Sequence, residues 1–553
     1  MRSIKLFGML FVAVCAAPLA VRYVGAAVKA DDKGAPRAAS ASRASFNESP
    51  AAQGSPERCR AVAGWSQGDV AVLSAEPVAA GTEVAMPMAP VKANAPAHCL
   101  VRGEIARRTG ADGKSYAISF ELRLPDDWNG RFLYQGGGGF DGFLWPALGA
   151  MTGGPTTALE RGFAVVSTDA GHRDSGAPGA QGDFGADPQA RRDYAYNALD
   201  RVTVTAKDLV TRYYATAIRR SYFAGCSGGG RQAMLASQRF PTYFDGIVGG
   251  APGMYIADIG IAGLRRFQAL DRLPGDAEHT LQPADQKLIF DALLAQCDAL
   301  DGRKDGIVFN QRQCHFDPGK LLCHPGGPQA CLSSGKLETL EALISPTRTS
   351  DGRMVYNGFH LDTGVATPEW LFGLAVGLPG SSHKQSMRSV QLAYVTPPVE
   401  RDYQTLTVDQ LVAGSEDMRR MTETASTDLD AFRARGGKIL LYHGMSDQIV
   451  SPDDTIHYYE ALSARYGSAT GQFARFFAVP GMLHCFGGPG PASFDPLAAM
   501  VDWVEHDRAP DRLIATNSRT MPGQSRPLCP YPSYARYEGR GDPARAESYA
   551  CAR

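Results

Sequence analysis

Three short motifs bring together the residue types of a serine nucleophile, a general base and an orienting acid. The first spans residues 225–229 and reads Gly-Cys-Ser-Gly-Gly, which fits the pattern G-x-S-x-G around Ser227. Asp447 and His484 follow later in the chain. A serine hydroxyl becomes a nucleophile when an imidazole takes its proton, and a carboxylate holds that imidazole in the productive tautomer. The chemistry expected of these residues is acyl transfer through Ser227.

Other residues of the same types compete for the roles of base and acid. Three further histidines are possible bases, and two aspartates follow Asp447 closely: His172, His443, His457, Asp453 and Asp454. We rank His443 and His457 lower because His443 ends an expected strand and His457 falls in a helical stretch. We expect the two aspartates to cap the helix that starts after Pro452.

The elements that must position these residues are short apolar runs closed by glycine, which are typical of buried parallel strands. Strands are expected at residues 131–134, 163–167, 221–224, 246–249, 438–444 and 473–478. A helical stretch at 231–239 follows Ser227. A serine on a tight turn between a strand and a helix is a nucleophile elbow, and the chain order Ser, Asp, His is that of α/β-hydrolases. The prediction is therefore an α/β protein with the α/β-hydrolase fold.

Backbone N–H groups should stabilise the oxyanion of the tetrahedral intermediate. Gly228 offers one donor because it directly follows the candidate nucleophile. A run of four glycines, residues 136–139, follows the first expected strand, and Gly138 or Gly139 is the candidate for the second donor. A merely flexible loop is the alternative interpretation of this run.

The N-terminus has the order of a secretory signal. Arg2 and Lys5 precede an apolar run at 6–21, and small residues continue to Ala30. The run is short for a membrane span, although an anchor is the alternative. Residues 31–56 are rich in Ala, Ser, Gly and Pro and are expected to be a disordered leader. We predict removal of residues 1–30 and a secreted or periplasmic protein without membrane contact.

The cysteines agree with export. The chain has 11 Cys, of which Cys15 lies in the signal, and an even number in the exported part suggests a full set of disulfides. No spacing typical of a zinc site is present. Neighbours in the sequence suggest the pairs Cys59–Cys99, Cys297–Cys314, Cys323–Cys331 and Cys529–Cys551, which leaves Cys226 and Cys485 beside the candidate nucleophile and base. Connectivity is not proved by this argument; a disulfide at Cys226 would exclude a cysteine nucleophile.

The composition is that of a globular enzyme. A net charge of -1 gives no indication of nucleic acid or an anionic membrane as a partner, and 44% hydrophobic residues can form a large core. No internal repeat is visible.

Together these motifs resemble the tannase and feruloyl esterase family, a branch of the α/β-hydrolases that includes a terephthalate monoester hydrolase. The mark of the family is a Cys-Ser, Asp, His-Cys constellation whose cysteines form a disulfide, and Cys226-Ser227, Asp447 and His484-Cys485 match it. The resemblance covers nearly all of residues 59–551. It implies a serine esterase for small aromatic carboxylic esters, such as gallates or ferulates, that works through an acyl-enzyme. An aliphatic-ester or lactone hydrolase and a catalytically silent binding protein are the alternatives.

The residue after the nucleophile bears on the substrate. In the terephthalate monoester hydrolase of the family this residue is acidic, and in many relatives it is polar. Gly228 removes that side chain from the pocket, so we do not expect strict terephthalate monoesterase activity.

The resemblance also implies a lid inserted between the nucleophile strand and the Asp447 strand, at residues 253–430, with the catalytic domain formed by 57–252 and 431–553. An insertion of this length far exceeds a simple crossover. Substrate preference should lie in the lid, where aromatic side chains could stack on an aryl acid and basic ones could bind a carboxylate or phenol. The candidates are Phe359, Trp370, Phe372, Tyr394, Lys384 and Arg388; ordinary lid core and solvated surface are the alternatives.

A loop of the lid, residues 297–307, is rich in oxygen donors. Calcium prefers carboxylate and carbonyl oxygens, but the spacing is not that of an EF-hand, and a solvated acidic turn is the alternative. The resemblance implies a structural calcium and no organic cofactor. Its ligands would be the side chains of Asp298, Asp301 and Asp305 and the carbonyls of Arg303 and Ile307.

Overall fold

The computed structural model describes residues 52–85, 92–150, 156–328, 330–378 and 380–553. The predicted signal peptide and most of the predicted leader lie outside these ranges. Within the leader, β1 (Ala52–Gln53) pairs with β8 (Asp127–Trp128), and Ser55 caps α2 (Pro56–Val62). The folded chain therefore includes residues before 57, where the leader was expected to end. In the described ranges, no helix is both long enough and apolar enough to cross a membrane.

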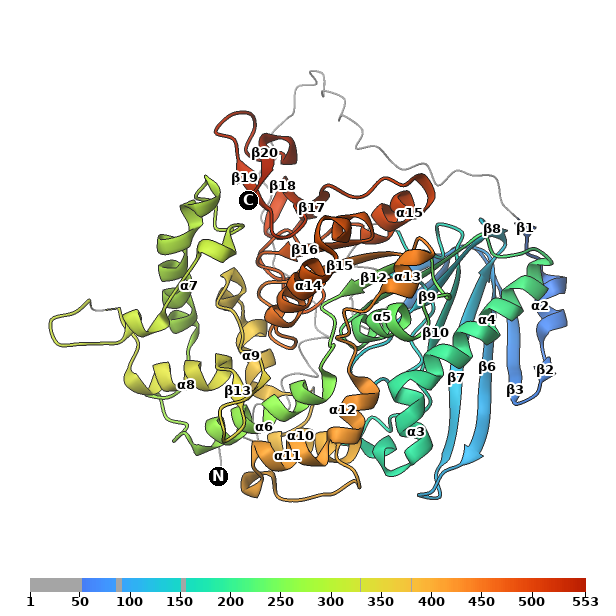
Figure 1. Ribbon diagram of the computed structural model, residues 1–553, viewed down its shortest axis with the longest axis horizontal. Helices are drawn as coiled ribbons and strands as arrows, with labels where there is room; N and C mark the ends of the chain where they lie inside the picture. The colour runs from blue at the N-terminus through green and yellow to red at the C-terminus, as the bar shows by residue number, and fades with distance from the viewer. Residues whose placement is uncertain (1–51, 86–91, 151–155, 329, 379) are drawn as a thin grey trace, which may run out of the picture. The chain divides into compact units, whose positions relative to one another are not determined.

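A sheet of ten strands forms the centre of the fold, in the order β16-β15-β12-β11-β9-β10-β7-β6-β3-β2 (Figure 1). Neighbouring strands run parallel from β16 to β10. All six predicted strands are present: β9 (Arg131–Gln135), β10 (Ala164–Thr168), β11 (Arg220–Cys226), β12 (Gly246–Gly250), β15 (Lys438–Gly444) and β16 (Ala474–Val479). Parallel strands end at one edge of the sheet, so the segments that follow β9, β11, β15 and β16 lie at a common edge.

The remaining strands of the sheet are antiparallel and were not predicted: β2 (Ser66–Gln67), β3 (Val70–Val78), β6 (His98–Thr109) and β7 (Ser115–Pro125). The sequences of β6 and β7 do not form apolar runs, because each strand buries charged side chains. In β7, Arg123 Nε lies 2.8 Å from Glu121 Oε1, and both side chains are almost fully buried. Pairing allows these charges to be buried at an acceptable cost.

Helices cover both faces of the sheet, and glycines in β12 permit their close approach. Residues an odd number apart on a strand face opposite sides. A Cβ on Gly246 would lie 2.7 Å from Met500 of α15 (Pro496–His506), whereas a Cβ on Gly249 would lie 3.4 Å from Ala233 of α5 (Gly228–Arg239). Further helices and strands are α3 (Pro188–Arg192), α4 (Ala198–Tyr214), α13 (Asp430–Ala434), α14 (Pro452–Tyr466), β4 (Thr82–Ala85) and β5 (Lys92–Ala95).

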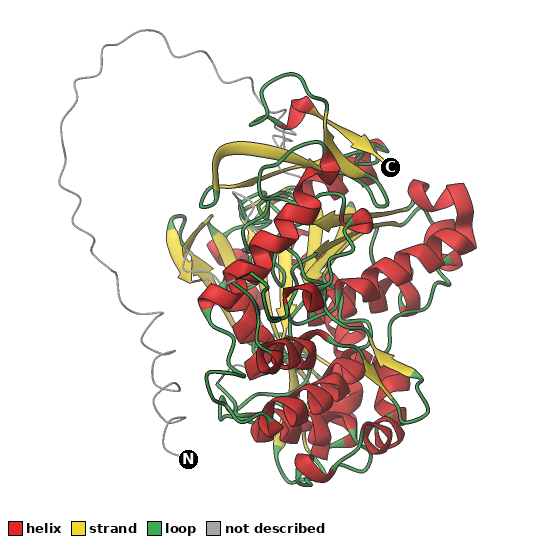
Figure 2. Cartoon of the chain, turned by 90° about the vertical axis from the view of Figure 1, so that its left-hand side faces the viewer, coloured by secondary structure: helices red, strands yellow, loops and turns green. Residues whose placement is uncertain are grey.

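The segment between β12 and β15 adds no strand to the central sheet and is mostly helical (Figure 2). It contains α6 (Ile256–Arg272), α7 (Pro283–Cys297), α8 (Ser334–Ile344), α9 (Pro368–Val376), α10 (His383–Tyr394), α11 (Val408–Gly414), α12 (Glu416–Thr422) and the hairpin of β13 (Thr347–Arg348) and β14 (Met354–Tyr356). Leu281, Ile289, Leu340 and Trp370 belong to an apolar core formed largely within this segment. We call it the lid; its exact limits at 253 and 430 stay a prediction.

Two hairpins end the chain, β17 (Leu513–Asn517) with β18 (Met521–Leu528) and β19 (Tyr534–Tyr537) with β20 (Tyr549–Ala552). They lie at the top of Figure 1, close to the C-terminus. The sheet, its parallel half and the helical insertion together give the α/β architecture predicted from the sequence.

Candidate active site

Ser227 lies on the turn between β11 and α5, in a backbone conformation with φ 64° and ψ -122°. A positive φ is uncommon for a residue with a side chain and signals a strained turn. The Ser227 N–H donates to Gly250 O at 3.0 Å, which ties the turn to the end of β12. The flanking glycines are needed, because a Cβ on Gly225 would lie 2.7 Å from Gly229 O. The turn thus has the form expected of a nucleophile elbow.

Asp447 and His484 meet at the same edge of the sheet, after β15 and β16. His484 Nδ1 lies 2.7 Å from Asp447 Oδ2, and the His484 backbone N–H donates to Gln448 Oε1 at 3.1 Å. The His484 side chain is 12% exposed and that of Asp447 is fully buried. With Nδ1 bound to the carboxylate, Nε2 of His484 is the nitrogen left to receive a proton.

A disulfide joins the turn of Ser227 to the loop of His484. Cys226 and Cys485 are bonded with their Cα atoms 5.9 Å apart. Since each cysteine is the chain neighbour of a candidate residue, this bond brings the serine turn and the histidine loop together. All five predicted cysteine pairs are confirmed, the other four being Cys59–Cys99, Cys297–Cys314, Cys323–Cys331 and Cys529–Cys551.

His443, considered above as a rival base, is a second partner of the acid. It is fully buried, with Nε2 3.1 Å from Asp447 Oδ2 and Nδ1 2.7 Å from Thr455 Oγ1. Burial alone would raise the pKa of Asp447, but the charge of His484 and hydrogen bonds from both histidines hold it far below its usual range. These contacts therefore favour the ionised form of Asp447.

The two rival aspartates have different partners. Asp453 accepts a hydrogen bond from His360 at 2.6 Å, and Asp454 accepts one from Asn357 at 2.7 Å. Neither caps α14 as expected: Ser451 is the N-cap residue, and the two aspartates lie in the first turn. Their negative charges still suit the N-terminal end of the helix dipole.

The glycine run after β9 lies against the start of α5. A Cβ on Gly228 would lie 3.0 Å from Gly139 N, so the two candidate donor segments are in close contact. Gly138 N–H already donates to Asp141 Oδ1 at 2.7 Å. No acceptor for Gly139 N–H is found among the described residues. Of the two candidates for the second oxyanion donor, Gly139 is the one whose N–H is not already bound.

Two buried side chains that the sequence analysis did not select hold this glycine run. Gly137 N–H donates to Gln232 Oε1 at 3.1 Å, and Gln232 Nε2 donates to Asp141 Oδ2 at 2.6 Å. Burial raises the pKa of Asp141 to about 6. The only sequence signal for Asp141 is its position two residues beyond the glycines; Gln232 lies one turn into α5 and carries none.

Trp370, Arg388 and Phe372 were predicted to contact the substrate, and the structure gives the first two other roles. Trp370 is fully buried in the lid core, so it cannot stack on a substrate. Arg388 is paired with Asp183 at 2.7 Å and Glu400 at 3.0 Å, so its charge is already compensated. Phe372 is 39% exposed and sits beside Gly373, whose Cβ would contact Gln448 next to Asp447. Phe372 alone of these three remains a candidate for contact with a substrate.

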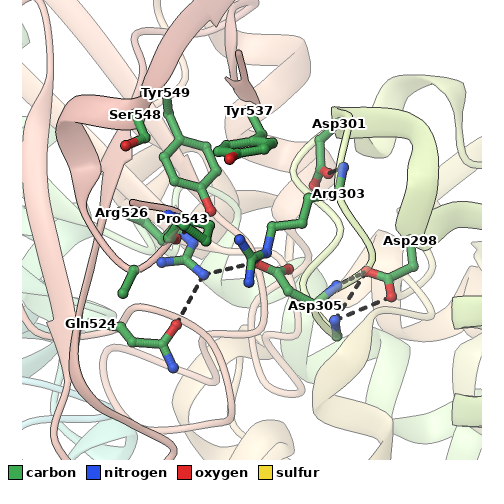
Figure 3. A network of polar contacts seen from close by, with 12 residues as sticks. Asp298, Asp301, Arg303, Asp305, Gln524, Arg526, Tyr537, Pro543, Ser548 and Tyr549 are labelled. Atoms are coloured by element: carbon green, nitrogen blue, oxygen red, sulfur yellow. Dashed lines mark hydrogen bonds and ion pairs between the residues drawn. The ribbon is translucent and has the colours of Figure 1, made fainter. Parts of the chain in front are cut away.

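The oxygen-rich loop of the lid is bound mainly by its own backbone (Figure 3). Asp298 Oδ1 accepts from Gly306 N at 3.0 Å, and Asp301 Oδ2 accepts from Phe309 N at 3.0 Å. Burial raises the pKa of Asp301 to about 7, and the nearby carboxylates of Asp305 and Asp298 add to this shift. Carboxylate oxygens gathered in one loop have, once ionised, the donor chemistry that a hard cation requires.

A buried arginine from the C-terminal hairpin reaches the same loop. Arg526 Nη2 lies 2.7 Å from Asp305 Oδ2, and its guanidinium lies 4.9 Å from the ring centre of Tyr549 (Figure 3). Within the described ranges, no group of three or more His, Cys, Asp or Glu side chains is arranged to hold a metal ion. The calcium site therefore stays a prediction, and an ion pair already ties Asp305 to β18.

Comparisons with known proteins agree with this geometry. A family model described as "Tannase and feruloyl esterase" matches residues 99–552. A mono(2-hydroxyethyl) terephthalate hydrolase of Piscinibacter sakaiensis is 40% identical over 84% of this chain and 87% of its own length. A probable feruloyl esterase B of Aspergillus clavatus is 30% identical over 79% of this chain and 84% of its own. The crystal structure of feruloyl esterase B from Aspergillus oryzae superimposes with a TM-score of 0.77 at 28% identity, over 90% of this chain and all of that one.

Proposed function

Because this chain belongs to the tannase and feruloyl esterase family, we propose that it is an exported serine esterase that hydrolyses aromatic carboxylic esters through Ser227, His484 and Asp447. That it is a carboxylic ester hydrolase with the α/β-hydrolase fold follows from its relatives. The catalytic residues, the substrate class and the export are the proposal.

The mechanism has two acyl-transfer steps. Ser227 Oγ attacks the ester carbonyl while His484 Nε2 takes its proton, and the Gly228 and Gly139 N–H groups bind the oxyanion. His484 then gives the proton to the leaving alcohol, and the aryl-acyl enzyme forms. Water repeats the sequence with His484 as base, which releases the acid and restores Ser227. Asp447 fixes the imidazole tautomer and stabilises its cation in both steps.

One observation carries the proposal. The 2.7 Å contact between His484 Nδ1 and Asp447 Oδ2 lies in the loop that Cys485 joins to Cys226, the neighbour of Ser227. A histidine bound in this way to a buried anion, and tied to a strained serine turn, is the arrangement that activates a hydroxyl. A purely structural histidine would not need the link to that turn.

The substitution Ser227→Ala tests the mechanism. Without the hydroxyl no acyl-enzyme forms, and kcat should fall on the order of 10^6-fold if the triad acts as a unit. Hydrolysis of methyl ferulate and methyl gallate is the measurement, and labelling by a fluorophosphonate should disappear in parallel. Turnover near that of the wild type would refute the role of Ser227. A wild-type chain that the probe does not label would instead indicate a silent fold.

Aromatic substrates are favoured by the named activities of the relatives and by Phe372, an exposed aromatic residue of the lid whose neighbour Gly373 lies against Gln448. A panel of methyl ferulate, methyl gallate, mono(2-hydroxyethyl) terephthalate and a short aliphatic ester would test this class. We expect the highest kcat/KM on the ferulate or gallate, because Gly228 has no side chain with which to bind a second polar group. Preference for the aliphatic ester would favour the alternative of an aliphatic-ester hydrolase.

We also propose export and a structural calcium ion. Five disulfides are typical of proteins from oxidising compartments, which supports export. For calcium, the support is the oxygen chemistry of Asp298, Asp301 and Asp305 in one loop of the lid. Bound calcium would neutralise these carboxylates and hold the lid loop; it has no part in the acyl transfer.

A further inference from the structure

One stretch of the lid, residues 356–364, follows the loop that carries Asp447; we call it the lid seam. Ser451 N–H donates to Tyr356 OH at 2.8 Å, and Asn357 and His360 bind the two aspartates at the start of α14. Gly364 N–H donates to Ser446 Oγ at 2.9 Å. The contacts thus run along both sides of Asp447, from Ser446 to Asp454.

Asp362 is the point at which the lid seam reaches both loops of the active site. Its Oδ2 accepts from Ser446 Oγ at 2.8 Å and from Gly481 N–H at 2.7 Å. Ser446 precedes Asp447, and Gly481 lies three residues before His484. Asp362 is 2% exposed, and Ser446 is fully buried. One carboxylate oxygen from the lid therefore joins the acid loop to the base loop.

Direct hydrogen bonds also join the two loops, and one of them runs from Met445 N–H to Val479 O at 2.9 Å. Ser446 N–H donates to Met482 O at 3.1 Å, and Gln448 accepts from His484 N–H. The lid seam is packed closely against both loops: a Cβ on Gly364 would lie 2.3 Å from Ser446 Cβ and 3.1 Å from Leu483 Cδ2. A charge-assisted hydrogen bond is about twice as strong as a neutral one, so the loss of Asp362 should be felt at both loops.

We propose that Asp362 is a positioning residue for the esterase reaction, through which the lid holds Asp447 and His484 at their working distance. This inference rests on the proposed function of Ser227, His484 and Asp447. Asp362 touches neither the substrate nor the reacting atoms. It acts through Ser446 and Gly481, so the lid is required for catalysis and not only for substrate choice.

The substitutions Asp362→Ala and Asp362→Asn test the proposal. Removing the bridge should lower kcat by up to about 100-fold, the cost of a misplacement of roughly 1 Å, with little change in KM. Asparagine should recover most of the activity, because a single oxygen accepts both hydrogen bonds. In the alanine variant the acid limb of kcat/KM should move to lower pH, since a loosened Asp447 stabilises the imidazolium less.

Asp258→Ala is the matched control. Asp258 is a lid carboxylate of similar burial, 4% exposed, and it pairs with Arg419 instead of an active-site loop. We expect the control to lower the melting temperature while kcat and the pH profile of the folded enzyme stay unchanged. Wild-type kcat in folded Asp362→Ala would overturn the proposal, and so would equal losses of kcat in both variants at equal folded fraction.

Ser227→Ala, measured beside them, separates this inference from the proposed function. If Ser227→Ala is inactive and Asp362→Ala is fully active, only the positioning role fails. If Ser227→Ala is fully active, the proposed function fails and the positioning role fails with it.

Discussion

At the scale of single residues, Asp447 divides its two oxygens between two tasks. Oδ1 accepts from the backbone N–H groups of Ile449 and Val450, at 2.8 and 2.9 Å, which fixes the turn. Oδ2 is shared by His484 and His443. His443 ranks lower as a base because it ends a strand, and in the structure it is a second donor to the acid.

Asp141 gives a prediction about pH at the same scale. As an anion it accepts from Gly138 N–H and Gln232 Nε2, whereas Asp141→Asn would set an NH2 group against one of these donors. We expect this variant to lower kcat by about 10-fold, less than the 10²–10³-fold cost of losing an oxyanion donor outright. Protonation should have the same effect on the wild type as the pH falls through about 6.

The pH profile separates Asp141 from the base. In the wild type, protonation of Asp141 should add a step of about 10-fold to the acid limb of kcat/KM near pH 6, and Asp141→Asn should lack this step. Stability should respond in the opposite sense. The folded-state pKa lies above the unfolded value near 3.9, so this group stabilises the fold as the pH falls from about 6 to 4. A wild-type acid limb without this added step would contradict the role of Asp141.

Sequence patterns predicted the site residues that belong to a motif, but they did not predict the residues that support them from other parts of the chain. Ser227, Asp447 and His484 stand beside strand ends and glycines, so they were visible. Asp362 accepts hydrogen bonds from residues 84 and 119 positions away in the chain, and Gln232 accepts one from a residue 95 positions away. No local sequence pattern marks either residue. Trp370 and Arg388 were predicted to bind substrate from their residue types alone. In the structure Trp370 is buried and Arg388 is paired with carboxylates.

At the scale of elements, the Cys226–Cys485 bond joins the turn after β11 to the loop after β16. It closes 259 residues, and on the chain-entropy model it stabilises the fold by about 5 kcal/mol. We expect Cys226→Ala/Cys485→Ala to lower kcat while the chain is still folded, because Ser227 and His484 lose their shared constraint. The measurement is kcat, with circular dichroism of the same sample to show that the chain is folded.

Removal of Cys529–Cys551 is the control for that prediction. This bond closes 22 residues in the C-terminal hairpins, and neither of its cysteines is a chain neighbour of Ser227, Asp447 or His484. Its loss should lower stability and leave kcat of the folded enzyme unchanged. Unchanged kcat after removal of Cys226–Cys485 would show that the sheet alone positions the serine and the histidine.

The strands of the central sheet could be predicted from the sequence where they consist of apolar residues. The six parallel strands are short runs buried on both sides, and the sequence predicted each within about two residues. The antiparallel strands were not predicted, because β7 buries Glu121 and Arg123 and β3 contains Pro77. When some of the inward-facing residues of a strand are charged, its sequence no longer alternates between apolar and polar residues. Such a strand resembles a polar loop unless the residues that pair with its charges are known.

At the scale of the whole molecule, the lid loop and the C-terminal hairpin meet at Asp305 and Arg526. If calcium binds this loop, a concentration 100 times its Kd should raise the free energy of unfolding by about 2.7 kcal/mol, and EGTA should reverse the effect. Thermal unfolding with calcium or EGTA is the measurement. Asp301→Asn should abolish the response, and Asp317→Asn, at an exposed lid aspartate outside the loop, should retain it. Equal unfolding temperatures in calcium and EGTA would indicate that the Arg526 ion pair alone holds the loop.

The connectivity of the disulfides has a consequence for biosynthesis. Four bonds join cysteines that are neighbours in the chain, but the bond between Cys226 and Cys485 passes over four others: Cys297, Cys314, Cys323 and Cys331. A chain oxidised in order as it emerges from a translocation channel would first offer Cys297 to Cys226. If the protein is exported as proposed, we therefore expect its maturation to need an isomerase that can undo such a mispairing. A cell that oxidises thiols without exchanging them should accumulate inactive protein.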